Sequence, residues 1–128
     1  MEFAASLPAS DMERAKAWYA RFFDLVPTEV TDFGDAWYDV GGGRILIYES
    51  QSAGTNQATA ATLLVDDVQA IVDTCKSRGA VFEDYDYGED FRTVDGVLAA
   101  PDGHKMAWLK DSEGNILSIT AASDRARS

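Results

Sequence analysis

The sequence predicts an α+β protein in which a βαβββ module occurs twice and forms a curved, mostly antiparallel sheet. A strand followed by a capped helix occurs twice, 56 positions apart, and a strand hairpin occurs twice, 71 positions apart. The chain has 128 residues, of which 46% are hydrophobic, so it can bury one core. We therefore expect a single domain over residues 1–128, with module one at about 3–50 and module two at about 58–120.

Each module begins with a helix whose start is marked in the sequence. Ser10 opens a capping box that Glu13 completes, and apolar residues then recur at helical spacing. Asp66 and Asp67 repeat the cap before a second amphipathic stripe, and Gly79 is a natural stop for that helix. Short strands are expected before the two helices, at residues 3–8 and 59–65.

Each module ends in a hairpin. Residues 36–39 align with residues 107–110, and residues 43–47 align with residues 114–118. The segments between them, 41–43 and 111–115, are rich in residues that form turns.

The helices repeat 56 positions apart, whereas the hairpins repeat 71 positions apart. This difference places about 15 extra residues in module two, between Val81 and Lys105. The part from Glu83 to Asp95 is acidic and aromatic, and it is either a lid over a ligand or a solvated loop. Residues 94–100 are expected to add a strand before the turn at Pro101. Residues 121–128 are expected to form a frayed tail.

Composition excludes several classes of partner and location. The formal net charge is −11, which disfavours nucleic acid and anionic membranes as partners. The apolar stretches are shorter than the roughly 20 residues that a membrane span needs, and the first six residues lack the positive start and apolar core of a signal peptide, so neither feature is expected. Cys75 is the only cysteine and is expected to be a small buried hydrophobe. These features predict a cytoplasmic protein.

Several motifs together resemble a known superfamily. They are the capped helix after Leu7-Pro8, the Val65-Asp66-Asp67-Val68 that opens the second helix, and the closing Trp108-x-x-Asp111-x-x-Gly114-Asn115-x-Leu117. In this order and with the duplication, they resemble the vicinal oxygen chelate superfamily of glyoxalases, bleomycin-resistance proteins and extradiol dioxygenases, over residues 3–120. The resemblance implies a glyoxalase-like fold, but that fold hosts many chemistries.

The resemblance also implies four positions at which metal-dependent members carry His, Gln or Glu. They fall on Ala4, on Ile47 or neighbouring Leu46, on Ala60 and on Ser118. A catalytic metal needs about three protein ligands, and these side chains supply none or one. We therefore expect no metal and no other cofactor.

Alternation along the strands predicts which residues line the cavity. If those four positions face it, so do Ser6, Ile45, Glu49, Thr62, Ile116 and Thr120. The opposite faces, which the helices would cover, carry Phe3, Leu7, Leu46, Tyr48, Leu63, Val65, Leu117 and Ile119.

Trp37 and Trp108 occupy equivalent places in the two hairpins, each two residues before a charged residue. We interpret them as a pair that looks into an open, partly wet groove and grips a planar ligand; packing is the alternative for each. The residues expected to contact the ligand are Trp37, Trp108, Glu49, Ser118, Thr62 and Phe91.

These features favour a metal-free protein that binds a small, planar organic ligand, as in sequestration of an antibiotic or metabolite. The alternative is a metal-independent lyase or isomerase with a carboxylate base such as Glu49. A third possibility is an interaction domain without a small ligand, and a metal-dependent glyoxalase or dioxygenase is disfavoured. The resemblance further implies a homodimer, the commonest closed assembly.

Overall fold

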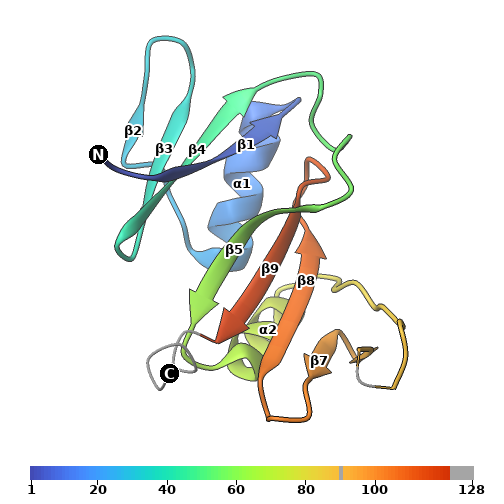
Figure 1. Cartoon of the computed structure of the whole chain (residues 1–128). Helices are drawn as coiled ribbons and strands as arrows, with labels where there is room; N and C mark the ends of the chain where they lie inside the picture. Colours follow the sequence, from blue (N-terminus) through green and yellow to red (C-terminus); the bar gives the residue numbers. More distant parts are fainter. Residues whose placement is uncertain (90, 122–128) are drawn as a thin grey trace. The chain divides into compact units, whose positions relative to one another are not determined.

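The helices and strands of module one follow the order βαβββ, and those of module two follow the same order with one additional strand after the helix (Figure 1). The structure is a computed structural model that describes residues 1–89 and 91–121. Seven of the eight residues of the expected tail, 122–128, therefore lie outside the described residues, as does Asp90. Module one contains β1 (Ala4–Ala9), α1 (Met12–Phe23), β2 (Glu29–Val30), β3 (Ala36–Val40) and β4 (Gly43–Glu49). Module two contains β5 (Thr59–Val65), α2 (Val68–Ser77), β6 (Thr93–Val94), β7 (Val97–Ala99), β8 (Lys105–Lys110) and β9 (Ile116–Ala121).

The strands form two sheets with corresponding orders. Sheet A has the order β1-β4-β3-β2, and sheet B has the order β5-β9-β8-β7-β6. In both sheets the first strand of the module lies beside its last strand, which is what a duplicated module predicts. The β1–β4 pair is parallel, whereas β4–β3 and β3–β2 are antiparallel. These orders confirm the predicted α+β class and its repeat.

The chain packs as two compact units. Unit one comprises Met1–Ala61 with Asp111–Ile116, and unit two comprises Thr62–Lys110 with Leu117–Ser128. In unit one α1 packs on β4, and in unit two α2 packs on β8 (Figure 1). Among the described residues, neither helix is long and apolar enough to cross a membrane.

Both helices start at an aspartate, and the two aspartates are 56 residues apart. Asp11 caps α1 by accepting from the Arg14 N–H at 3.0 Å, and Asp67 caps α2 in the same way from the Ala70 N–H. The predicted N-cap, Ser10, is therefore wrong by one residue. Its N–H and hydroxyl instead donate to the carboxylate of Glu113. The predicted stop at Gly79 is confirmed, because Gly79 has a φ of +101° directly after the Arg78 cap.

The two hairpin turns differ in length, and this difference changes which side chains share a face. The β3–β4 turn has two residues between the paired Val40 and Gly43. The β8–β9 turn has three, because the Asp111 N–H donates to the carbonyl of Asn115 at 2.9 Å. Equivalent positions of the two modules are therefore 71 residues apart before the turn and 72 residues apart after it. The sequence alignment of Gly43 with Gly114 misses this step, and a one-residue shift moves side chains to the opposite face.

Pairing in sheet A therefore corrects the predicted face of β4. Ile45 pairs with Ala5 and Ile47 pairs with Leu7, which is fully buried. The side chains of Ile45 and Ile47 consequently lie on the buried face with Leu7. Leu46 and Tyr48 occupy the opposite face, where Ile47 was expected. The expected cover over Phe3 is also wrong, because this side chain is 90% exposed.

The buried faces carry the core of each unit. In unit one Tyr19 and Ala15 of α1 are buried together with Leu7, Ile47 and Tyr38. The burial of Leu7 and of Ile47 stabilises the fold by roughly 1.5–3 kcal/mol each, because these side chains leave water. The core of unit two contains, among others, Val72, Ala107, Leu109, Leu117, Ile119 and Cys75. The prediction of a buried Cys75 is thus confirmed.

The extra segment of module two contains a short hairpin. One strand was expected over residues 94–100, but β6 and β7 are separate and pair with each other. Asp95 and Gly96 turn the chain between them, with φ values of +53° and +84°. Asp-Gly is a favoured pair for a turn in which both residues have positive φ. A side-chain carbon at Gly96 would also meet Cβ of Phe82 at 2.7 Å, so only glycine fits there.

Candidate functional site

The predicted polar contacts of sheet B come together beside Trp108. The hydroxyls of Thr62 on β5 and Ser118 on β9 are hydrogen-bonded at 2.6 Å. Counting along the antiparallel strands from the Asp111–Asn115 pair places Ser118 opposite Trp108 on β8. Thr62, Ser118 and Trp108 therefore share one face of the sheet, as the alternation of their strands predicts.

This face has a second polar group in Thr120, two residues beyond Ser118 on β9. The Thr120 hydroxyl is buried and has no hydrogen-bond partner among the described residues. A buried hydroxyl without a partner costs about 1–3 kcal/mol, so such a group favours a ligand that can bond to it. Thr120 was expected on this face but not among the ligand contacts.

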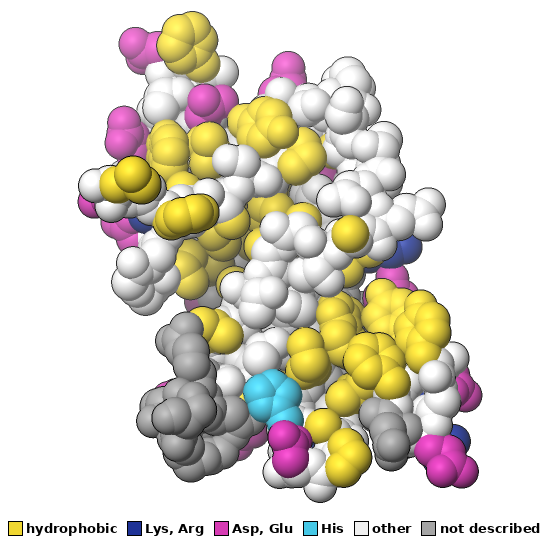
Figure 2. Space-filling view, in the orientation of Figure 1, with side chains coloured by type: hydrophobic (Ala, Val, Ile, Leu, Met, Phe, Trp, Pro, Cys, Tyr) yellow, Lys and Arg dark blue, Asp and Glu magenta, His cyan; other side chains and the backbone are white. Residues whose placement is uncertain are grey.

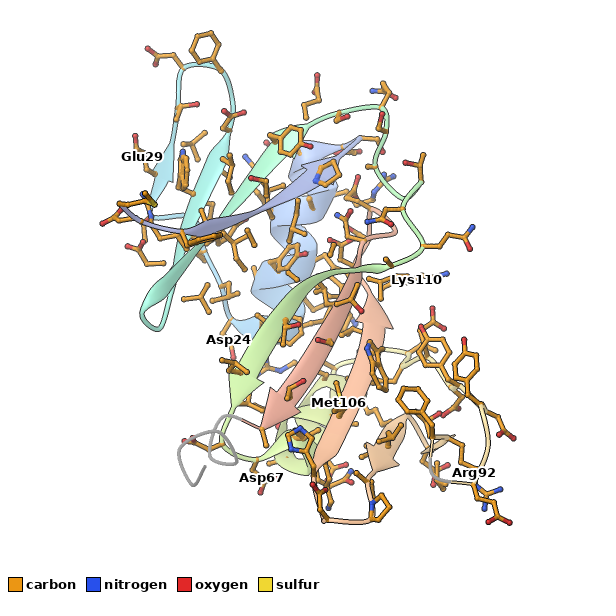
Figure 3. All side chains as sticks on the ribbon, viewed as in Figure 1. Asp24, Glu29, Asp67, Arg92, Met106 and Lys110 are labelled. Carbon is orange, nitrogen blue, oxygen red and sulfur yellow. The ribbon has the colours of Figure 1, made fainter. Side chains whose placement is uncertain are left out.

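Aromatic side chains from the extra segment cover Trp108. The Tyr85 ring meets it edge to face with centroids 5.5 Å apart, and the Phe91 ring lies at 6.1 Å. Trp108 is only 8% exposed as a result. The expectation that Trp108 looks into an open, wet groove is therefore wrong, because the segment packs its rings onto the indole. Figure 3 shows a group of aromatic side chains in the part of unit two between the labelled Lys110 and Arg92.

Tyr87 completes a group of four rings. Its ring stacks on Tyr85 with centroids 6.1 Å apart and lies 5.7 Å from Phe91. We call Tyr85, Tyr87, Phe91 and Trp108 the aromatic cluster. Tyr87 is 74% exposed and Phe91 is 45% exposed, so the cluster has a buried base and an exposed rim. Figure 2 shows the corresponding group of hydrophobic side chains at the right of unit two.

Asp84 holds the extra segment in place. Its carboxylate accepts from the Thr93 hydroxyl at 2.7 Å and from the Gly96 N–H at 2.9 Å. These two hydrogen bonds lower the pKa of Asp84 below its ordinary value. The Tyr85 N–H donates to the Thr93 hydroxyl oxygen, and the Thr93 N–H donates to the carbonyl of Tyr85. The segment is thus tied at its base, while Tyr87 stands exposed at its rim.

Trp37 lies on the open face of sheet A in unit one. It pairs with Leu46 on β4, which in turn pairs with Ser6 on β1. The Arg44 guanidinium lies over its ring at 4.4 Å and also bonds to Asp39 at 3.1 Å. Trp37 remains half-buried, in agreement with an indole that shares a face with charged neighbours. Because Trp37 and Trp108 belong to different units, the clamp between them stays a prediction.

Glu49 does not join this face. It pairs with Ala9 at the end of β4, so it lies on the side of Ile47 and is exposed at the strand end. The expected position of Glu49 beside Ala4 and Trp37 is therefore wrong. The cause is the same one-residue difference in turn length that misplaced Ile47.

The side chains at the metal positions do not fit a metal. With the corrected face, the four positions hold Ala4, Leu46, Ala60 and Ser118, whose only donor atom is one hydroxyl. Among residues 1–89 and 91–121, no three His, Cys, Asp or Glu side chains come close enough to hold an ion. Divalent metals in proteins are held by imidazole, thiolate or carboxylate groups, and these positions offer none.

Comparison with known proteins places this fold in a family. Residues 3–119 match the model of the Glyoxalase/Bleomycin resistance protein/Dioxygenase superfamily, and the chain belongs to it. A search of curated proteins found no match.

Several solved structures share the fold at low sequence identity. A glyoxalase/bleomycin resistance protein from Catenulispora acidiphila is 21% identical, with a TM-score of 0.71 over 95% of this chain and 98% of that one. A bleomycin-binding protein in complex with bleomycin is 20% identical, with a TM-score of 0.70 over 94% and 98%. A lactoylglutathione lyase from Agrobacterium tumefaciens is 18% identical, with a TM-score of 0.67 over 95% and 93%. Since a binding protein and a lyase both share it, the fold alone does not define the chemistry.

Proposed function

We propose that this protein binds a small, planar organic molecule and uses no metal to do so. The observation that carries the proposal is the face of sheet B around Trp108, where an indole and further rings adjoin a hydroxyl pair and a buried, unpartnered hydroxyl. Apolar surface with a few polar groups is typical of small-molecule sites.

Sequestration is the role that these groups support. Rings and hydroxyls can hold a ligand by stacking and hydrogen bonding, but they are poor proton acceptors at neutral pH. The fold shared with a bleomycin-binding protein supports the same role. The enzymatic alternative with Glu49 as base loses support, because Glu49 lies on the other face of β4. As parts of the same proposal, the protein is cytoplasmic and acts as a homodimer.

Isothermal titration calorimetry with two probes tests the proposal. The probes are bleomycin and acridone, a neutral planar compound, each titrated in buffer with and without EDTA. We expect at least one probe to bind with an affinity that EDTA leaves unchanged. Replacing Ser118 with Ala breaks the hydroxyl pair and should weaken binding about three- to tenfold, the value of one hydrogen bond. Thr28→Ala, which removes an exposed hydroxyl in unit one, is the matched control.

Two results contradict the proposal. One is the absence of heat and of a melting-temperature shift with both probes. The other is binding that EDTA abolishes and added zinc restores, which would show that a metal is required.

A further inference from the structure

From the aromatic cluster and its charges, we propose that the ligand is a planar organic cation, held against the exposed rings of Tyr87 and Phe91. This inference deepens the proposed function and rests on it. The inference adds the charge of the ligand and the part of unit two that binds it.

The arrangement of the rings is the first step. Each ring of the aromatic cluster contacts two others, so the four rings form a closed circuit with centroid separations of 5.5–6.1 Å. The faces of aromatic rings carry partial negative charge, and a cation within about 6 Å of a centroid is attracted. A ligand at the rim of this circuit can contact more than one ring at that distance.

The exposure of the rings is the second step. Tyr87 is 74% exposed and Phe91 is 45% exposed, although Trp108 beneath them is nearly buried. The exposed Val94, at 66%, extends the same segment. Apolar groups that stay in water next to a packed base are typical of a binding surface, since packing alone would bury them.

The third step is the net negative charge of residues 83–95, which determines the charge of the ligand that we expect. Residues 83–95 contain six acidic residues, Glu83, Asp84, Asp86, Glu89, Asp90 and Asp95, against the single basic residue Arg92. The whole chain carries −11. Burial is the main cause that raises the pKa of the Tyr85 phenol above its ordinary value, and the nearby carboxylate of Glu83 raises it further.

Lys110 is one of the cationic side chains near the aromatic cluster, and it does not reverse this balance. Lys110, on the same face of β8 as Trp108, is 3.5 Å from the carboxylate of Glu83. This pair neutralises one carboxylate and leaves Asp86 and Glu89, both exposed, in the segment. Negative potential at an aromatic surface attracts cations and repels anions, so a cationic ligand is the complementary occupant.

Calorimetry with three planar probes of similar size tests the inference. They are proflavine, a cation, acridone, which is neutral, and acridine-9-carboxylate, an anion. We expect proflavine to bind about ten times more tightly than acridone, and the anion to bind most weakly. Raising the salt concentration from 20 to 500 mM should weaken proflavine binding and leave acridone binding nearly unchanged.

Substitutions test which residues cause the preference for the cationic probe. Tyr87→Leu keeps an apolar side chain but removes the ring, and it should weaken proflavine binding about five- to thirtyfold, whereas Tyr87→Phe should retain it. Phe33→Leu, an exposed ring in unit one, is the matched control. Glu89→Gln should reduce the preference for proflavine over acridone, and Asp32→Asn should not.

The outcomes separate this inference from the proposed function. If acridone binds as tightly as proflavine, or if Tyr87→Leu binds proflavine like the wild type, the cation site is refuted while small-molecule binding stands. If none of the three probes binds, and bleomycin does not bind either, the proposed function itself fails. If sedimentation shows a dimer that Tyr87→Leu converts to a monomer, the rings are a subunit contact and the inference is overturned.

Discussion

The carboxylate of Glu113 and the guanidinium of Arg14 are joined by two hydrogen bonds, of 2.8 Å and 3.0 Å. The Glu113 side chain is fully buried, whereas Arg14 is half exposed. The same carboxylate accepts from the N–H groups of Ser10 and Asp11 at the start of α1. A residue of the β8–β9 turn thus satisfies donors at a helix N-terminus, where negative charge is favoured.

We predict that Glu113→Gln lowers the free energy of unfolding by about 1–3 kcal/mol. The amide loses the charge of the hydrogen-bonded pair and cannot accept all of its bonds. Chemical denaturation with urea measures the change. The control is Glu13→Gln, which breaks the Glu13–Lys16 pair, where the glutamate is 86% exposed. The control should change stability by less than about 0.5 kcal/mol. Equal effects of the two substitutions would contradict the role of Glu113.

The same carboxylate predicts a pH dependence. Burial by itself raises the pKa of Glu113, but hydrogen bonds from Arg14, Ser112 and the Asp11 N–H outweigh it and lower the pKa from 4.5 to about 2. A carboxyl whose pKa is lower in the folded state stabilises the fold above its unfolded pKa, and that contribution is lost as pH falls through the folded pKa. Between pH 4.5 and 2 the wild type should therefore lose stability that Glu113→Gln does not lose. Parallel stability curves for both proteins over this window would refute the assignment.

Sequence repeats predicted most of the fold because helix caps and turns are local. The capped helices begin 56 residues apart, and β5 has the predicted bounds Thr59–Val65. The true N-cap of α1 could not be predicted, because Ser10 is engaged by Glu113, a residue 103 positions away. Long-range hydrogen bonds of this kind leave no periodic pattern in the sequence.

The candidate site was predicted less completely, and turn length is one reason. Trp108, Thr62 and Ser118 share the face that alternation predicts, but Glu49 does not, because the first turn is one residue shorter than the second. The aromatic cluster was only partly foreseen, since Phe91 was the one ring of the segment assigned to the ligand. Tyr85 and Tyr87 lie in irregular backbone, where periodicity cannot indicate which side chains meet.

We predict that the protein is a homodimer at micromolar concentration. Phe3 and Phe33 of unit one are 90% and 93% exposed, and apolar groups left in water favour association. Light scattering coupled to size-exclusion chromatography should give twice the 13.9 kDa of the chain. A mass of 13.9 kDa at 50 µM would refute the prediction.

We predict that the extra segment exchanges its amide hydrogens more slowly when a ligand is bound. The N–H of Tyr87 donates to the carbonyl of Phe91, and the N–H of Thr93 donates to the carbonyl of Tyr85, both at 2.8 Å. A ligand on the rings should stabilise these bonds and slow their exchange about tenfold at saturating proflavine, because opening must then break the ligand contacts as well. The amides of Leu117 and Ile119 in β9 serve as controls, and equal protection with and without proflavine would exclude a lid.

The last prediction concerns Trp37 and Trp108 as the two halves of a ligand clamp. Trp108 is buried under Tyr85 and Phe91, so Trp108→Ala should cost about 3–5 kcal/mol of folding stability, as for any large core residue. Because Trp108→Ala is expected to destabilise the fold, it cannot separate a role in packing from a role in binding. Trp108→Phe, which keeps a ring, should lower the folding stability by less. Trp37 is half-buried, so Trp37→Ala should fold and show any loss of binding directly.

For a clamp, Trp37→Ala should weaken binding of the tighter planar probe by about 1–3 kcal/mol, roughly ten- to a hundredfold, because stacking and apolar contact are lost. Trp108→Phe should weaken it by a smaller factor, with a loss of stability smaller than that of Trp108→Ala. Calorimetry gives the binding change, and thermal unfolding gives the stability of each variant. The control is Trp18→Phe, since Trp18 packs with Tyr19, Phe22 and Phe23 of α1. If Trp37→Ala binds the probe like the wild type, Trp37 is a packing residue stacked under Arg44 and the clamp does not exist.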